Sequence, residues 1–466
     1  MASKSIVVIG GGPAGYTAAL RAARLSGKVT LVEASKLGGT CLNTGCIPTK
    51  FLLHTAELYQ SIKTAERYGI KTEKVNVDFA RMQERKKLAI STLTAGITSL
   101  LKESRVEVIK GRARLTPSKQ VEIERTGEKK LTLKPDGIIL ATGARAVTLP
   151  VPGAESPDIV GAESLLELER FPASVVIIGG GVIGVEVATI LARLGSQVSI
   201  VEIMPRVIPS FDAEIAGLLS DGLRKEGITV YCGAKVSLIE GSPGNKQVSF
   251  LTGGETRELK AEVVATAVGR KPNLENLGLQ ECGIEVQRNG TKVDERMQTS
   301  VPGIYAAGDV TGKTMLAHAA FMEGIVAAEN AMGKEAQMDY SAVPQAIFTS
   351  PEVAAVGLTQ EEATARGYET KTGRFPFAAN SLATVLSERR GIVKIIADRK
   401  SDKILGVHIA GAGASALIAE ATLAVRLGLT TKEIGKTMHV HPTLSEALWE
   451  AALDASGDSI HKSEPR

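Results

Sequence analysis

The chain has 466 residues, of which 44% are hydrophobic and 23% charged, and this length suits roughly three or four globular domains of about 100–200 residues each. Its formal net charge of +4 is small and gives no argument for a nucleic-acid or membrane partner. No apolar run reaches the roughly 18 residues of a membrane-spanning helix, and the early first strand leaves no room for a targeting peptide, so we expect a cytoplasmic protein.

The strongest internal signal is a repeated pattern of apolar strand, glycine-rich turn, amphipathic helix and second strand ending in glutamate. The copies are residues 5–33, SIVVIGGGPAGYTAALRAARLSGKVTLVE, and residues 174–202, SVVIIGGGVIGVEVATILARLGSQVSIVE. Each is a βαβ unit with the G-x-G-x-x-G spacing of dinucleotide-binding sites, so the repeat predicts two nucleotide-binding domains. The motif glycines are Gly10, Gly12 and Gly15 in the first copy, and Gly179, Gly181 and Gly184 in the second.

These glycines permit a tight turn and let the backbone approach a pyrophosphate at the helix N-terminus. Glu33 and Glu202 end the second strands and would accept hydrogen bonds from ribose hydroxyls. A carboxylate at Glu202 repels a 2′-phosphate, so we expect the second site to prefer NAD to NADP. Arg206, four residues further on, is a nearby cation that could weaken this preference.

The segments between and after the repeats predict an alternation of helices and strands. Helical spacing of apolar residues covers 51–103, and three short alternating segments over 105–133 predict a small β insertion. From about residue 344 the pattern changes to that of a separate α+β domain. The other predicted elements are closing strands in DGIILATGA (136–144) and AEVVATAVGRKPN (261–273), a strand over 304–310, and helices near 213–226 and 315–332.

Cys41 and Cys46 lie in GGTCLNTGCIPTK, residues 38–50, and three kinds of site fit such a pair. A zinc site is disfavoured because structural zinc cysteines are usually two to four residues apart and zinc needs four ligands. Neither Cys232 nor Cys282 has a cysteine nearby, so we expect no metal.

A disulfide requires a distorted segment, because residues five apart on a regular helix point about 140° away from each other. Gly45 supplies the freedom for such a distortion. If the chain is helical after Cys46, Lys50 lies on the same face and favours a Cys46 thiolate. Two unpaired cysteines are the alternative.

GGTCLNTGCIPTK resembles the active-site signature of the flavin-dependent pyridine nucleotide-disulfide oxidoreductases. The resemblance covers essentially the whole chain through GGGPAGYTAALRAA, ILATGA, GGGVIGVE, AVGRKPN, GIYAAGDV, LAHAAFMEG, FTSPEVAAVG and HPTLSEALWEAA. It implies an α/β fold with two Rossmann-like dinucleotide-binding domains, a central domain and a C-terminal α+β dimerisation domain. The implied bounds are 1–148 for the FAD domain, 149–272 for the NAD domain, 273–343 for the central domain that completes the FAD site, and 344–466 for the dimerisation domain.

By this resemblance, the first glycine motif holds FAD and the second holds NAD. Cys41 and Cys46 form a redox-active disulfide, with Cys41 facing the substrate and Cys46 facing the flavin. Lys50 lies beside the flavin and pairs with Glu186, and a helix that opens near Met315 points its positive end at the flavin. The remaining implied contacts are Ala113, Gly143, Asp309 and Ala317 to FAD, and Glu186, Val236 and Gly269 to NAD.

The C-terminal HPTLSE has two interpretations. It is a capping box with Thr443 as N-cap and Glu446 three residues later, preceded by a His-Pro turn. By the resemblance, His441 is instead a catalytic acid–base and Glu446 orients it. His439 is the local rival but lacks the match to the His-Pro position.

HPTLSEAL and GDSIH are most similar to family members that oxidise a dihydrolipoyl group and reduce NAD. Members that reduce mercuric ions carry a C-terminal cysteine pair, whereas no cysteine follows Cys282 here. Members that reduce glutathione disulfide favour NADP, which Glu202 opposes. The resemblance also implies a homodimer in which His441 serves the other subunit, and lipoylated proteins of 2-oxoacid dehydrogenase or glycine cleavage complexes as partners. A flavoprotein transhydrogenase or NADH-sensing subunit without dithiol turnover is the alternative.

Overall fold

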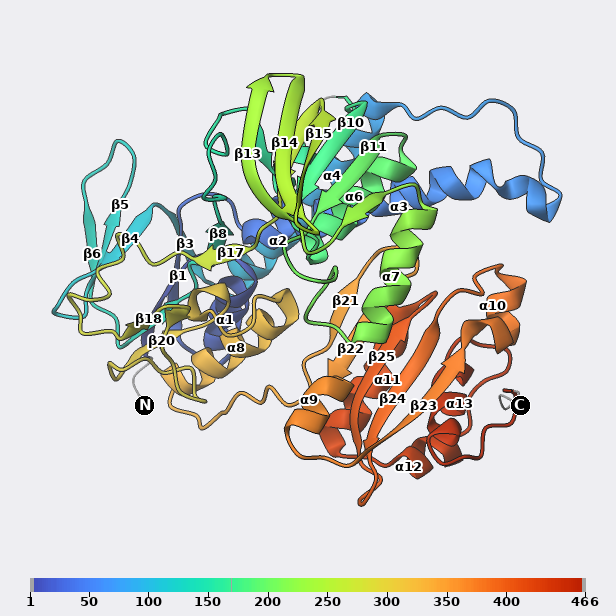
Figure 1. Cartoon of the computed structure of the whole chain (residues 1–466). Coiled ribbons are helices and arrows are strands. Elements are labelled where there is room, and N and C mark those ends of the chain that lie inside the picture. The colour runs from blue at the N-terminus through green and yellow to red at the C-terminus, as the bar shows by residue number, and fades with distance from the viewer. Residues whose placement is uncertain (1–3, 169, 463–466) are drawn as a thin grey trace. The chain divides into compact units, whose positions relative to one another are not determined.

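The structure is a computed structural model that describes residues 4–168 and 170–462. The chain folds into two compact units, whose helices and strands are labelled in Figure 1. The first unit comprises Met1–Leu52, Asn76–Val147 and Gly269–Asp339, and the second comprises Leu53–Val75, Thr148–Val268 and Tyr340–Arg466. Within the described ranges, no helix is long and apolar enough to cross a membrane. The domain boundaries given above stay a prediction.

A five-stranded parallel sheet forms the centre of the first unit. Its strands are β1 (Ser5–Ile9), β2 (Lys28–Glu33), β3 (Glu107–Lys110), β7 (Gly137–Leu140) and β20 (Ile304–Ala306), and the helices beside it are α1 (Pro13–Arg24), α4 (Phe79–Glu103) and α8 (Ala317–Ala331). The strand order is β20-β7-β1-β2-β3. The inner strands are buried runs of Val, Ile and Leu, as expected for parallel sheets that helices cover on both faces. The chain returns after residue 300 to add β20, which completes the sheet begun at the N-terminus.

The second repeat builds a matching parallel sheet in the second unit. Its strands are β9 (Ile159–Gly161), β10 (Ser174–Ile178), β11 (Gln197–Val201), β12 (Thr229–Tyr231) and β16 (Val263–Thr266), and its helices are α5 (Ala162–Leu165), α6 (Val182–Arg193) and α7 (Ala213–Lys225). The strand order is β12-β11-β10-β16-β9. An antiparallel sheet follows β12 in the chain, formed by β13 (Lys235–Ser242), β14 (Asn245–Thr252) and β15 (Glu255–Ala261), and the two sheets share one hydrophobic cluster.

The C-terminal part of the second unit is α+β, as the sequence predicts. Its antiparallel sheet has the order β21-β22-β25-β24-β23, and helices that follow β25 pack against it (Figure 1). The strands are β21 (Gln345–Ile347), β22 (Val353–Gly357), β23 (Thr370–Pro376), β24 (Ile392–Asp398) and β25 (Ile404–Ala410), and the helices are α9 (Gln360–Ala365), α10 (Ser381–Val385), α11 (Ala414–Leu427), α12 (Thr431–Lys436) and α13 (Glu446–Asp454).

The predicted β insertion is smaller than expected. Its strands are β4 (Arg112–Leu115), β5 (Val121–Glu124) and β6 (Leu131–Leu133), in one antiparallel sheet. The prediction was wrong for β3, which pairs in parallel with β2 at the edge of the main sheet. As an edge strand β3 has polar residues facing solvent, so its sequence alternates like that of an antiparallel strand. Gly111 lies where the chain changes sheet, and a Cβ there would stand 2.7 Å from the Glu124 carbonyl oxygen.

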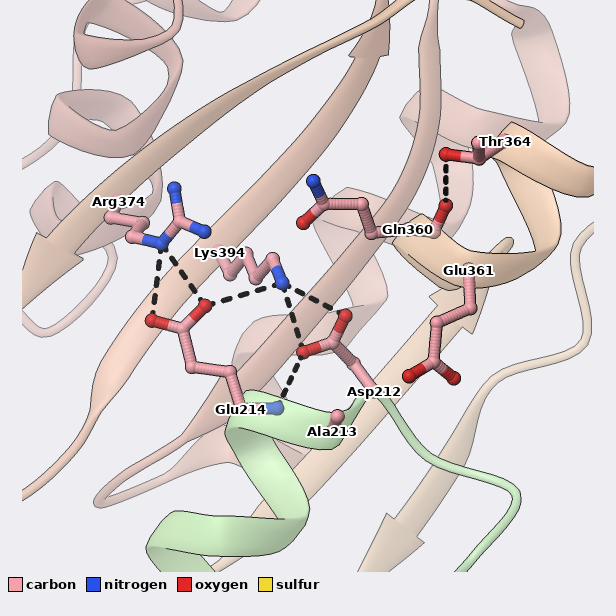
Figure 2. Close-up of a pocket in the computed structure, with 8 residues that line it drawn as sticks. All are labelled: Asp212, Ala213, Glu214, Gln360, Glu361, Thr364, Arg374 and Lys394. Atoms are coloured by element: carbon pink, nitrogen blue, oxygen red, sulfur yellow. Dashed lines mark hydrogen bonds and ion pairs between the residues drawn. The ribbon is translucent and has the colours of Figure 1, made fainter. Parts of the chain in front are cut away.

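A buried ion pair and a partly exposed one tie the N-terminus of α7 to the C-terminal sheet (Figure 2). Lys394 Nζ on β24 lies 3.0 and 2.9 Å from the two carboxylate oxygens of Asp212, which is the N-cap of α7. The same Nζ lies 3.2 Å from Glu214, and Arg374 Nε lies 3.1 and 3.0 Å from the two oxygens of Glu214. Because Asp212 and Lys394 are both buried, each charge depends on its partner.

Lys394→Met should lower the free energy of unfolding by about 3–5 kcal/mol, because it leaves the Asp212 carboxylate buried without its cation. Burial opposes ionisation of Asp212, but the hydrogen bonds and charge of Lys394 hold its pKa below the ordinary value. The contribution of this pair to the free energy of unfolding is therefore complete above about pH 4, the ordinary pKa of aspartate. It is lost as the pH falls through the lowered pKa that Asp212 has in the folded protein.

Denaturant unfolding of wild type and Lys394→Met at neutral and at acidic pH measures this effect. Lys400→Met is the control, because Lys400 pairs with Glu369 at 3.3 Å on the surface, where such pairs contribute at most about 1 kcal/mol. Equal losses of stability in the two variants would contradict the prediction, and so would a Lys394→Met loss that stays constant from neutral to acidic pH.

Candidate functional site

The two cysteines lie on either side of a break between two helices of the first unit. Cys41 is on α2 (Gly39–Asn43), and Cys46 is the first residue of α3 (Cys46–Lys63). A side-chain hydrogen bond joins the two thiols. The expected distortion is therefore present, and Gly45 does not need a left-handed conformation for it, because its φ is not positive. Gly45 supplies space instead, since a Cβ there would lie only 3.2 Å from the Thr40 carbonyl oxygen.

The surroundings distinguish the two sulfurs. The hydrogen bond to Cys46 and, after it, burial raise the pKa of Cys41 far above its ordinary value, and the nearby Asp309 carboxylate raises it further. The Lys50 ammonium acts in the opposite direction, and it follows Cys46 by one helical turn on α3, as the sequence predicts. The Cys41 thiol therefore retains its proton and donates it toward the Cys46 sulfur.

Two residues beside the thiols were missed by the sequence reasoning. Arg270, on β17 (Arg270–Pro272), donates to the Ala144 carbonyl at 2.6 Å and to Thr40 Oγ1 at 3.3 Å. Burial lowers the pKa of Arg270, while the charges of Asp309 and Cys46 raise it. Arg270 belongs to the family motif AVGRKPN, from which the sequence analysis predicted a role only for Gly269.

Tyr16 on α1 is the other missed residue. Burial and the neighbouring Cys41 raise the pKa of its phenol, and its ring lies 6.0 Å from that of Phe321 on α8. Its only signal in the sequence was its place just after the first glycine motif.

The first glycine motif forms a tight turn with open backbone at the N-terminus of α1. A Cβ at Gly15 would lie 1.8 Å from the Gly10 carbonyl oxygen, whereas a Cβ at Gly12 would meet nothing closer than 3.8 Å. The Gly11 N–H donates to Glu33 Oε2 at 2.6 Å, and the Ser35 N–H donates to Oε1 at 2.6 Å. A carboxylate held in this way keeps lone pairs for further donors such as ribose hydroxyls. The open backbone before the helix fits a pyrophosphate.

The second motif repeats these contacts in the second unit. A Cβ at Gly184 would lie 2.0 Å from the Gly179 carbonyl oxygen, and one at Gly181 would meet nothing within 4 Å. Glu202 accepts hydrogen bonds from the Gly180 N–H and, at 2.7 Å, from the Met204 N–H. Each motif therefore has both the open backbone and the fixed carboxylate that a dinucleotide requires.

The other predicted cofactor residues lie in varied settings. Gly143 and Gly269 have positive φ angles and open space where a Cβ would stand, so backbone contacts to a ligand are sterically possible. Burial raises the pKa of Asp309 although Arg270 lowers it. The helix expected to open near Met315 begins at Ala317. The remaining three are Ala113 on β4, Val236 on β13 and the buried Glu186 on α6, whose Oε1 accepts from the Phe348 N–H at 3.0 Å.

His441 is bound by Glu446 in the second unit. His441 Nδ1 lies 2.8 Å from Glu446 Oε1, and the Thr443 N–H donates to Glu446 Oε2 at 2.8 Å. Burial opposes the ionisation of Glu446, but Thr443 and His441 hold its pKa below the ordinary value. The prediction of Thr443 as N-cap was wrong, because α13 begins at Glu446 with Ser445 as N-cap. Glu446 binds the Thr443 N–H in the turn before α13 and the histidine at the same time.

The rival His439 has a different partner. Its Nε2 lies 3.0 Å from Glu420 and its Nδ1 lies 3.0 Å from the Thr437 carbonyl oxygen, so both ring nitrogens are engaged. The His441 side chain is 68% exposed, and its Nδ1 contact with Glu446 directs Nε2 away from that carboxylate. Of the two histidines, His441 is therefore the one with a ring nitrogen available to a substrate.

Comparison with known proteins gives matches over nearly the whole chain. Residues 4–324 match the pyridine nucleotide-disulphide oxidoreductase family, and residues 343–452 match its dimerisation domain. The chain is 42% identical to the dihydrolipoyl dehydrogenase of Thermus scotoductus over 466 residues, which cover 99% of each chain.

Two solved structures have the same fold. LpdA from Mycobacterium tuberculosis matches with a TM-score of 0.89 and 30% identity, over 96% of this chain and 99% of that one. The HOCl-induced flavoprotein disulfide reductase RclA from Escherichia coli, solved as a Cu(II) complex, matches with a TM-score of 0.86 and 30% identity, over 97% of this chain and 99% of that one. These matches confirm the predicted fold class, and the chain belongs to the pyridine nucleotide-disulphide oxidoreductase family as a flavoprotein disulfide oxidoreductase.

Proposed function

We propose that the protein is a dihydrolipoyl dehydrogenase that oxidises a protein-bound dihydrolipoyl group to its disulfide and reduces NAD⁺. The observation that carries the proposal is the His441–Glu446 pair, because it offers a base for deprotonating a dithiol in a chain that also has a redox-active cysteine motif. The relative from Thermus scotoductus named dihydrolipoyl dehydrogenase supports the substrate class. The fixed Glu202 carboxylate supports NAD over NADP.

The two glycine motifs would hold the two cofactors of the family. Gly10, Gly12, Gly15 and Glu33 would hold FAD, together with Asp309 and the backbone of Ala113, Gly143 and Ala317. Gly179, Gly181, Gly184 and Glu202 would hold NAD, together with Glu186, Val236 and Gly269. When bound, FAD accepts the electron pair of the dithiol and NAD⁺ takes it up as hydride. The pairing of Lys50 with Glu186 stays a prediction.

The chain's own residues carry the thiol chemistry. His441 accepts a proton from the dihydrolipoyl group, and the resulting thiolate attacks Cys41 of the Cys41–Cys46 disulfide. The cysteine S–S bond breaks as a mixed disulfide forms, with Cys46 leaving as thiolate. The second substrate thiol then displaces Cys41, which closes the lipoyl disulfide. Cys41 is left protonated beside Cys46, and its raised pKa and its hydrogen bond to Cys46 support this state.

The C-terminal domain would form the homodimer. Its match to the family's dimerisation domain supports self-association. Large exposed apolar side chains mark interaction surfaces, and four of them lie shortly before His441 in this domain. They are Leu423 and Leu427 on α11, with Met438 at 97% and Val440 at 74% exposure just before His441. In such a dimer His441 would serve the cysteines of the other subunit. The substrates would be lipoylated proteins of 2-oxoacid dehydrogenase or glycine cleavage complexes.

Purified protein should reduce NAD⁺ with dihydrolipoamide and should use NADP⁺ poorly, because Glu202 opposes a 2′-phosphate. Absorbance of NADH at saturating dihydrolipoamide measures the reaction. The contrary result is no lipoamide turnover together with strong NADPH-dependent reduction of glutathione disulfide, which would assign the protein to another disulfide reductase of the family.

Cys46→Ser should abolish dihydrolipoamide oxidation, because no disulfide can then accept the substrate thiolate. Thiol titration after anaerobic NADH treatment should find both site thiols newly formed in wild type and neither in the variant. Cys282→Ser is the matched control, since the Cys282 thiol only donates to the Thr116 carbonyl at 3.0 Å and serine keeps that donor. Wild-type protein that gains no thiols with NADH would favour a transhydrogenase or NADH-sensing role.

His441→Gln should lower kcat for dihydrolipoamide by about 10²–10⁴-fold, the usual contribution of general acid–base catalysis. Reduction of an artificial electron acceptor by NADH should stay near the wild-type rate, because that reaction needs no dithiol deprotonation. His439→Gln is the matched control, since His439 is bound by Glu420. Equal losses of kcat in the two variants would contradict the proposed role of His441, provided that sedimentation shows an intact dimer.

A further inference from the structure

Arg206 is the one basic residue in the segment 203–212 that connects Glu202 to α7. This segment folds back on the second glycine motif. The Ile208 N–H donates to the Gly180 carbonyl at 2.9 Å, and a Cβ at Gly180 would lie 3.0 Å from Val207 Cγ1. The backbone of Arg206 is therefore close to the place where the motif would hold the adenosine ribose, and a cation there would favour a 2′-phosphate.

The side chain of Arg206 is instead occupied by Glu361. Arg206 Nη2 lies 3.0 Å from Glu361 Oε2 and Nη1 lies 3.4 Å from Oε1, a two-pronged geometry typical of arginine with a carboxylate. Nη2 also approaches the carbonyl oxygens of Pro209 at 3.4 Å and Phe211 at 3.5 Å. These contacts turn the guanidinium toward the start of α7.

The position of Glu361 is set by the C-terminal domain. It lies in the first turn of α9, whose start is held by a capping box between Thr359 and Glu362. Figure 2 shows Glu361 in the pocket between α9 and α7, without an interaction to the other residues drawn. The nearby pair of Asp212 and Lys394 ties α7 to the same sheet, so both ends of the Arg206–Glu361 pair are held in place.

The position of the half-buried Arg206 side chain depends on this pair. Its Nε is buried and makes no hydrogen bond within the described structure. A buried donor without an acceptor is unfavourable, so the ion pair with Glu361 is the main contact that compensates for this position. Without Glu361, moving to a place where water or an anion can accept its hydrogen bonds lowers the free energy of the guanidinium.

We infer that Glu361 is a specificity-determining residue of the dinucleotide site, because its carboxylate withdraws Arg206 from the ribose 2′ position. Glu202 then acts there without a compensating cation. This inference rests on the proposed binding of NAD by the second glycine motif. It adds to that proposal a residue outside the NAD domain, 155 positions from Arg206 in the chain.

The test compares Glu361→Gln and Glu361→Ala with wild type for both nicotinamide cofactors. The ratio of kcat/KM for NADP⁺ to that for NAD⁺ should rise by up to about fivefold, the upper end of the range expected for one exposed charge pair. The change should lie in the KM for NADP⁺, with kcat for NAD⁺ unaltered. Calorimetric titration with 2′,5′-ADP and with ADP measures the same preference without turnover, and the affinity for 2′,5′-ADP should rise by the same factor.

Two further variants show whether a rise in this ratio comes from the release of Arg206 or only from a more positive net charge. Glu369→Gln raises the net charge equally and breaks the surface pair with Lys400, and it should leave the ratio unchanged. The double variant Arg206→Gln/Glu361→Gln should return the ratio to that of wild type. An unchanged ratio in both Glu361 variants, or an equal rise in either of these two controls, would overturn the inference. Failure of the proposed function is distinct from this outcome, because wild type itself would then not turn over dihydrolipoamide with NAD⁺.

Discussion

The close approach of Cys41 and Cys46, whose thiols share a hydrogen bond, is the constraint on which the proposed chemistry depends. It requires the interruption between α2 and α3, because on one continuous helix the two side chains would point about 140° apart. The interruption also makes Cys46 the first residue of α3 and so places Lys50 one turn after it. Arg270 and Asp309 arrive from a distant part of the chain, and their opposite charges lie beside the same sulfurs. Hydrogen bonding and nearby charge thus make two chemically identical thiols unequal.

The two dinucleotide motifs share a second constraint, in which a glutamate at a strand end is held by backbone N–H groups. Glu33 is bound by Gly11 and Ser35, and Glu202 is bound by Gly180 and Met204. In each pair, one N–H comes from the strand-to-helix turn of the repeat and the other from the segment that follows the glutamate. The carboxylates are therefore held in fixed positions, and in the proposed dinucleotide sites their surroundings would decide which ribose is accepted. In the second unit these surroundings include Arg206, whose charge is already paired.

Carboxylates with two engaged oxygens recur through the second unit. Glu446 uses one oxygen for the Thr443 N–H and the other for His441, so one carboxylate fixes the turn before α13 and also orients the histidine. Glu214 binds Lys394 and Arg374 in the same double manner. A carboxylate has several acceptor positions, which lets one side chain both fix the backbone and orient a partner.

Most of the architecture and much of the site could be predicted from the sequence, because the βαβ repeats, the helix after Cys46 and the α+β change near residue 344 are local patterns of periodicity and spacing. The family resemblance, carried by whole motifs, supplied the wider assignments. The tertiary structure alone decided the edge position of β3, the space that requires Gly45, the placement of Arg270 beside the thiols and the capture of Arg206 by Glu361. Each of these depends on atoms from distant segments or on the steric space around one backbone position. Spacing along the chain indicates which residues could form the site, whereas burial and charge in the folded protein determine which of them act together.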